Sequence, residues 1–188
     1  MKTVKNIENM IIINKSKFIT NLFYVETIND VEKYLKLIKD KYKDATHNCY
    51  AYIIDNTKRF NDDGEPNGTA GMPILEVLEK NNLNHVLAIV TRYFGGIKLG
   101  AGGLLRAYTK SITTALMNTN IFDLTNGYLA KITFDYNREK ELNKLLDKYT
   151  ILKKIYDSNI TYLVEIDDII LNKLDIDVEI IKNINIKK

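Results

Sequence analysis

Residues 90–108 read VTRYFGGIKLGAGGLLRAY, which joins an apolar run, a glycine-rich run and a run with helical spacing. The nearly continuous apolar segment His85–Arg92 predicts a buried central β-strand. Tyr93–Gly103, the glycine segment, predicts a loop, and Gly103–Asn118 predicts a helix. The sequence therefore places a glycine-rich connection between a buried strand and the positive end of a helix.

The glycine segment is a candidate site for a phosphate or a carboxylate. Eight of the nine glycines lie between Gly64 and Gly103, and glycine lets backbone N–H groups approach a ligand closely. From Lys80 to Phe122 the chain has five cations and no acid. The spacing fits neither the P-loop nor the dinucleotide fingerprint, and a tight connection in which glycine serves packing is the alternative. The candidate ligand- or RNA-binding residues are Arg92, Tyr93, Phe94, Gly95, Gly96, Lys98, Gly100, Gly102, Gly103 and Arg106.

Two adjacent aromatic residues, Tyr93 and Phe94, open the glycine segment. In an RNA-binding protein, one such ring stacks on a base while Arg92 and Lys98 contact phosphates. In the structural alternative, one ring belongs to the core and the other covers the loop.

An acidic segment, Phe60–Gly71 (FNDDGEPNGTAG), precedes the helix predicted to begin at Pro73. Its oxygen-bearing side chains suit a hard cation, but their spacing differs from that of a calcium loop, and we expect no metal. The carboxylates alternatively receive a basic partner, cap the following helix or belong to an ordinary turn. The candidate residues are Asp62, Asp63, Gly64, Glu65, Pro66, Gly68 and Thr69. We expect the acidic and glycine segments to line one cleft.

His47 and Cys49 are secondary candidates because they stand two residues apart on a predicted strand. Alternation along a strand turns both side chains to the same face, and a thiol beside an imidazole suggests a nucleophile. A small buried hydrophobe is the commoner role of a cysteine in a strand.

The other predicted elements fall into two parts with a change of composition near Asn120. The first part holds strands Met10–Ile13, Lys17–Val25 and Asn48–Asp55, helices Thr27–Tyr42 (with Thr27 as cap) and Pro73–Lys80, and a loop over Asn56–Gly71. After a linker at Leu124–Gly127, the second part holds strand Tyr128–Asp135, helix Arg138–Tyr149, strands Ile151–Tyr156 and Ile160–Ile166, a short helix Asp167–Leu174 and strand Val178–Ile186. This β-α-β-β-α-β order is that of a ferredoxin-like domain.

Composition indicates an ordinary globular protein. The chain has 188 residues, 45% of them hydrophobic, and a formal net charge of +3. A single cysteine excludes an internal disulfide, and no apolar run reaches the roughly 20 residues that span a membrane. The first residues lack the features of a signal peptide. We therefore expect a cytoplasmic protein with no membrane or DNA partner and no cofactor.

Several strings resemble the motifs of the IMPACT family, in particular its bacterial YigZ branch. They are DATHNCYAY (Asp44–Tyr52), NDDGEPNGTAGMPIL (Asn61–Leu75) and VTRYFGGIKLGAGGLLRAY (Val90–Tyr108), with KSKF (Lys15–Phe18) similar to the family's entry motif. The family often carries serine where this chain has Asn61, so a role for that hydroxyl does not transfer. The resemblance is close over residues 1–120, and beyond them it rests on length and predicted order.

The resemblance implies an α+β protein of two domains. Residues 1–122 are expected to form an IMPACT-type βα sandwich, the fold of the second domain of a small-subunit ribosomal protein, shared with elongation factor G and small-molecule kinases. Residues 123–188 are expected to form a ferredoxin-like domain similar to the last domain of elongation factor G. Eukaryotic relatives are linked to translational control through protein partners on the ribosome.

Three functions follow from these patterns and the resemblance. The leading hypothesis is a non-enzymatic, translation-associated protein that contacts RNA or the ribosome through a glycine-rich basic cleft. The second is a protein–protein adaptor in translational regulation. The third is an enzyme acting on a phosphorylated small molecule or nucleotide, in which the acidic segment would hold magnesium or supply a base.

Overall fold

The computed structural model describes residues 1–187 as a mixed α+β protein; Lys188, the last residue of the expected second domain, lies outside them. The chain divides into two compact units, Met1–Phe122 and Asp123–Lys188. Each unit has its own buried hydrophobic residues and is described by itself.

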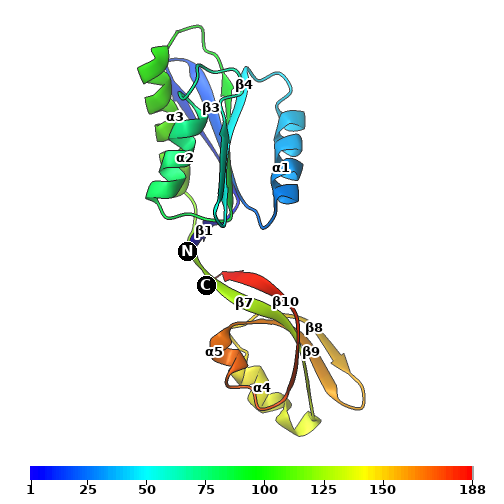
Figure 1. Ribbon diagram of the computed structural model, residues 1–188. Coiled ribbons are helices and arrows are strands. Elements are labelled where there is room, and N and C mark those ends of the chain that lie inside the picture. Colours follow the sequence, from blue (N-terminus) through cyan, green and yellow to red (C-terminus); the bar gives the residue numbers. More distant parts are fainter. Residues whose placement is uncertain (188) are drawn as a thin grey trace. The chain divides into compact units, whose positions relative to one another are not determined.

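The first unit is built around one antiparallel sheet with the strand order β2-β3-β6-β4-β5. Helix α1 covers one face of this sheet, and helices α2 and α3 cover the other (Figure 1). The elements are β1 (Lys2–Val4), β2 (Ile7–Ile13), β3 (Ser16–Tyr24), α1 (Ile28–Lys41), β4 (His47–Ile54), β5 (Thr57–Asn61), α2 (Gly71–Lys80), β6 (Val86–Tyr93) and α3 (Gly100–Met117).

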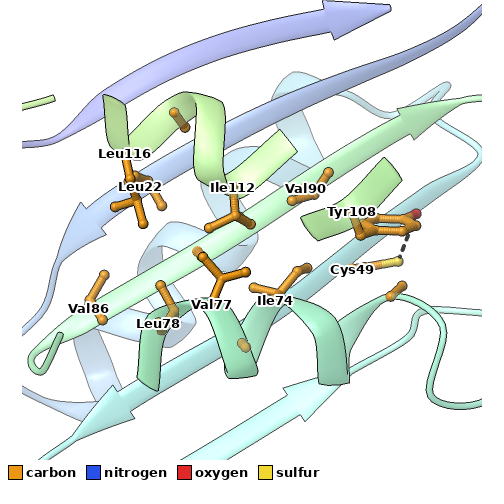
Figure 2. Close-up of a cluster of buried hydrophobic side chains, with 14 of the residues drawn as sticks. Leu22, Cys49, Ile74, Val77, Leu78, Val86, Val90, Tyr108, Ile112 and Leu116 are labelled. Atoms are coloured by element: carbon orange, nitrogen blue, oxygen red, sulfur yellow. Dashed lines mark hydrogen bonds between the residues drawn. The ribbon is translucent and has the colours of Figure 1, made fainter. Parts of the chain in front are cut away.

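The predicted central strand is confirmed as β6, which pairs with β3 on one side and β4 on the other. Its residues Val86–Arg92 are buried, as expected for a strand covered on both faces. Between the sheet and helices α2 and α3 lies a core that includes Leu22, Ile74, Val90 and Ile112 (Figure 2). This core includes residues of β4 and β6, and the candidate loops extend from the ends of β5 and β6.

Two sequence-based expectations for the first unit are wrong. Thr57–Asn61, predicted as loop, is strand β5, which pairs with β4 through a turn at Asp55. All five residues of β5 are exposed on an edge, so the strand lacks the apolar alternation that identifies half-buried strands. The predicted loop over Tyr93–Gly103 is shorter, because α3 begins at Gly100 and takes in Gly102 and Gly103.

The second unit has the strand order β10-β7-β9-β8, all antiparallel, with its helices packed on one face. The elements are β7 (Ile121–Phe134, which begins in the first unit), the 3₁₀ turn η1 (Tyr136–Arg138), α4 (Glu139–Leu145), β8 (Ile151–Tyr156), β9 (Ile160–Ile166), α5 (Asp168–Leu171) and β10 (Asp177–Lys187). Both helices are shorter than predicted.

The predicted linker Leu124–Gly127 is also wrong, because these residues belong to strand β7 and pair with the end of β10. Gly127 suggested a flexible break, but a side chain there would collide with Ile186 and with the backbone of Ile166. The glycine therefore permits close strand packing. Within residues 1–187, no helix combines the length and apolar character needed to cross a membrane.

Candidate functional site

The acidic and glycine segments line one cavity of about 310 Å³ in the first unit. The acidic segment follows β5 and the glycine segment follows β6, two strands that flank β4 in the sheet. The cavity is lined by Thr46, His47, Glu65, Pro66, Arg92, Phe94, Lys98, Leu99, Gly100, Ala101 and Leu104.

The aspartates of the acidic segment hold the backbone of their own loop and of α2. One Asp62 oxygen, Oδ1, accepts hydrogen bonds from the N–H groups of Ala70 (3.0 Å) and Gly71 (2.7 Å), where α2 begins. The other, Oδ2, accepts from Gly68 N–H at 2.9 Å. Asp63 accepts from the Asn48 N–H at 2.6 Å. The contacts of Asp62 Oδ1 correspond to the helix-capping alternative that the sequence left open.

The cation at the start of the glycine segment has its partner inside the protein. Arg92 Nη1 donates to Glu65 Oε1 at 2.7 Å, and Tyr108 OH donates to the same oxygen at 2.7 Å. The side chains of Arg92 and Glu65 are only 6% and 3% exposed. The expectation that Arg92 contacts an external phosphate is thus corrected, because a buried guanidinium needs an internal counter-charge and Glu65 supplies it.

The structure gives His47 and Cys49 different partners. The Cys49 thiol donates to the Asp62 carbonyl at 2.9 Å and lies 3.3 Å from the Tyr108 hydroxyl (Figure 2). Burial raises the pKa of the Cys49 thiol to about 12. His47 Nδ1 lies 2.8 Å from the Asp63 carbonyl, and its ring lines the cavity. The hypothesis of an imidazole-activated thiol is therefore corrected in favour of a buried, protonated cysteine.

Part of the glycine segment serves packing. Phe94 N–H donates to Thr46 Oγ1 at 3.0 Å, and Gly95 N–H donates to Ser16 Oγ at 3.2 Å. Any side chain at Gly95 would collide with the backbone of Lys15 and Ser16. This close approach fixes the β2–β3 turn, which carries Lys15, beside the glycine segment. The packing alternative therefore holds at Gly95, and the amides of Phe94 and Gly95 are already engaged.

Other residues of the segment remain open to solvent. Gly96 and Gly100 adopt positive φ values (85° and 66°), and nothing lies within 4 Å of a side chain built at either position. Such backbone favours glycine for its conformation. The half-buried Tyr93 donates its hydroxyl to Asp44 at 2.8 Å, and the Lys17 ammonium lies over one face of its ring, 4.7 Å from the ring centre. Phe94 is 47% exposed and lies against the Arg92 guanidinium, 5.6 Å from ring centre to Cζ.

Exposed cations lie in the cavity lining and on the segments that adjoin it. Lys98 lines the cavity. The Arg106 guanidinium reaches back toward the first turn of α3: a Cβ atom built at Gly102 would lie 3.5 Å from Arg106 Nη1. Among residues 1–187, Lys15, Lys98 and Arg106 have no carboxylate partner. Sequence reasoning missed Lys15 and Thr46 as parts of the site, although both lie in strings, KSKF and DATHNCYAY, that it singled out.

Comparison with known proteins places this site within a family. Residues 14–116 match the Impact N-terminal domain. The IMPACT family member YvyE of Bacillus subtilis is 43% identical over 160 residues, which cover 82% of this chain and 74% of that protein. An IMPACT family member of Haemophilus influenzae is 36% identical over 163 residues, which cover 83% of this chain and 79% of that protein.

A similar structure covers both units. A crystal structure described as that of a hypothetical protein has 27% identity and a TM-score of 0.65, covering 92% of this chain and 88% of the other. YigZ of Escherichia coli is 38% identical over 109 residues, which cover 55% of this chain and 53% of that protein. The family match over the cavity-forming unit and the two long alignments with bacterial relatives agree. This protein therefore belongs to the IMPACT family.

Proposed function

We propose that this protein is a non-enzymatic, translation-associated binding protein that contacts RNA or the ribosome through the opening of the cavity in its first unit. The family's link to translational control, which the sequence motifs implied, supports the biological setting. We place it in the cytoplasm accordingly.

One observation carries the proposal: the exposed Lys98 lines the same cavity as the exposed Phe94, and within residues 1–187 neither Lys98 nor the exposed Lys15 and Arg106 of the adjoining turn and helix has a carboxylate partner. Unpaired cations beside a free aromatic face are the combination that binds single-stranded RNA, since cations neutralise phosphates and the ring stacks on a base. Arg92 contributes by positioning Phe94 and Glu65, because its own charge is paired.

We favour binding over catalysis because the aspartates that an enzyme would use are engaged. Asp62 accepts three backbone hydrogen bonds and Asp63 accepts one. With three hydrogen bonds accepted, Asp62 has few lone pairs left for a metal or for a substrate proton. The adaptor hypothesis shares the same surface and is separated by the experiment below.

The proposal is tested by titrating a fluorescent eight-nucleotide oligouridine with the protein over a salt series. Binding should weaken steeply with salt, by a log–log slope of roughly 0.7 for each phosphate contacted. The double variant Lys98→Ala/Arg106→Ala should bind more weakly and with a shallower slope. Lys36→Ala, which removes an exposed cation from α1 on the opposite face of the sheet, is the matched control and should bind like the wild type.

Co-sedimentation of the wild type and of the double variant with purified ribosomes tests whether the surface that binds the short RNA also binds the ribosome. Loss of co-sedimentation in the variant supports the proposal. Absence of RNA binding at low salt, or affinity that stays flat as salt rises, overturns it. Ribosome association that survives the double variant assigns the contact to a protein partner and favours the adaptor.

We further propose that the two units are separate domains, 1–122 and 123–188. The element order β7-α4-β8-β9-α5-β10 and the strand order β10-β7-β9-β8 support a ferredoxin-like second domain. The helix pair α2 and α3 on one face of the first sheet supports the ribosomal-protein-type βα sandwich.

A further inference from the structure

The cavity in the first unit combines apolar walls with polar atoms. Pro66, Leu99 and Leu104 contribute apolar surface, Phe94 lies at the opening, and the polar groups come from a small set of side chains on the other elements. Pockets for heterocyclic ligands are built in this way, with a few polar groups that fix orientation. Its volume of about 310 Å³ falls at the lower end of the range for small-molecule sites.

Two of those polar groups present hydrogen-bond acceptors. Glu65 receives Arg92 and Tyr108 on Oε1, whereas Oε2 receives no hydrogen bond from residues 1–187. His47 Nδ1 faces the Asp63 carbonyl, which only accepts, so Nδ1 carries a hydrogen, and the neutral form of the ring presents a lone pair on Nε2. These two acceptors, Glu65 Oε2 and His47 Nε2, lie 3.8 Å apart.

The position of the acceptors is fixed by the surrounding loop. Arg92 and Tyr108 hold the Glu65 carboxylate from one side. Gly64 adopts a φ of 86° and packs against the His47 ring. A Cβ atom built at Gly64 would lie 3.5 Å from His47 Nδ1. The pair is therefore preorganised to meet two neighbouring N–H donors on one flat group.

We propose that the cavity takes a single unstacked guanine base of the bound RNA. Among the four RNA bases, guanine has two adjacent donors, N1–H and the N2 amino group, on its Watson–Crick edge, and these match the two acceptors. Adenine, cytosine and uracil each place an acceptor next to their donor, which would face a lone pair of Glu65 or His47. This inference rests on the proposed function and adds base selectivity to it.

An arginine side chain of a protein partner also has adjacent donors, but the charge around the opening disfavours it. A peptide cation would have to pass Lys98, which lines the cavity, whereas the phosphates flanking a flipped base are attracted to it. Phe94, half-exposed at the opening, offers a surface on which the neighbouring base or the guanine itself stacks.

The test compares three eight-nucleotide oligouridines that carry guanosine, inosine or adenosine at one central position, with unmodified oligouridine as the reference for general RNA binding. Guanosine should bind about tenfold more tightly than adenosine, the selectivity that a two-bond base contact provides. Inosine keeps N1–H but lacks the N2 amino group, so its affinity should fall between the two.

Two variants examine the cavity itself. Glu65→Gln replaces an acceptor by an amide and should abolish the preference for guanosine over adenosine; its thermal unfolding is measured alongside because Arg92 loses its counter-charge. Ala101→Leu adds bulk at an exposed cavity-lining position of α3 and should reduce the preference in a protein whose buried ion pair is intact. Thr109→Leu adds similar bulk two turns further along α3 and should retain the preference.

The outcomes separate the two proposals. Salt-dependent binding of oligouridine without any preference among guanosine, inosine and adenosine overturns the guanine site and leaves the proposed function standing. Loss of all RNA binding overturns both. Displacement of guanosine-containing RNA by free GMP, but by neither AMP nor an arginine amide, supports the guanine site. Stronger displacement by the arginine amide overturns it in favour of a protein ligand.

Discussion

At the scale of single residues, Cys49 provides a direct test of how closed the core is. The thiol is fully buried, and burial raises its pKa to about 12, so the reactive thiolate is scarce near neutral pH. We expect iodoacetamide at pH 8 to leave the native protein unmodified and to alkylate it fully in denaturant. Cys49 is the only cysteine of the chain, so mass spectrometry assigns the adduct without ambiguity. Rapid alkylation of the native protein would instead restore the nucleophile hypothesis.

The same scale shows which site residues a sequence can reveal. The sequence identifies Glu65 and Arg92 as candidate site residues because both are charged and lie in or next to a glycine-rich segment. Their pairing was not predictable, since they stand 27 residues apart and meet only because strand order brings two loops to one cavity. The sequence alone predicts that Arg92 contacts an external phosphate. In the structure the Arg92 guanidinium is buried and pairs with Glu65.

At the scale of elements, α1 begins with a complete capping box. Thr27 Oγ1 accepts from Asp30 N–H at 3.2 Å, and the Asp30 carboxylate accepts from Thr27 N–H at 2.9 Å. Burial alone would raise the pKa of Asp30, but the hydrogen bonds from Thr27 and Glu26 outweigh it and lower the pKa below its ordinary value. A lowered folded-state pKa means that the contribution to stability is present above the unfolded-state pKa and is lost as the pH falls through the lower folded value.

We therefore expect Thr27→Ala to lower the free energy of unfolding by about 1 kcal/mol at pH 7, the usual cost of removing an N-cap. Asp30→Asn should also be less stable than the wild type at pH 7, and this difference should shrink as the pH falls from about 4 through the lowered folded-state pKa of Asp30, below which both proteins are neutral at position 30. Urea unfolding of both proteins at pH 7 and at an acidic pH measures this difference in the free energy of unfolding. Glu32→Gln, an exposed charge change on the same helix, is the control; a constant difference at both pH values would contradict the capping role.

Elements differ in how well their sequence predicts them. Thr27 and the spacing of Val31 and Ile38 indicated α1 correctly because its cap and buried stripe are local features. The start of α3 was missed because its first four residues, Gly100–Gly103, include three glycines, which have low helix propensity. Gly127 was read as a linker, since the Ile186 side chain that requires a glycine comes from the far end of the chain.

At the scale of the whole molecule, the two units have separate cores joined by one strand. Ile112 is fully buried in the core beneath α2 and α3, and Ile132 is fully buried in the core of the second unit. Strand β7 begins in the first unit and continues through the second, so the covalent connection is an ordered strand. Separate cores are expected of separate folding units, whereas a strand shared by both units is a possible route for coupling between them.

Ile112→Ala and Ile132→Ala distinguish these possibilities. Each removes a buried side chain and should cost about 2–5 kcal/mol in the unit that contains it. Hydrogen–deuterium exchange followed by peptide mass spectrometry reports both units at once, which matters because the chain has no tryptophan. We expect faster exchange confined to peptides of residues 1–122 for the first variant and to those of residues 123–187 for the second. Faster exchange in both units from either variant would mean that β7 transmits the loss and that the chain unfolds as one cooperative unit.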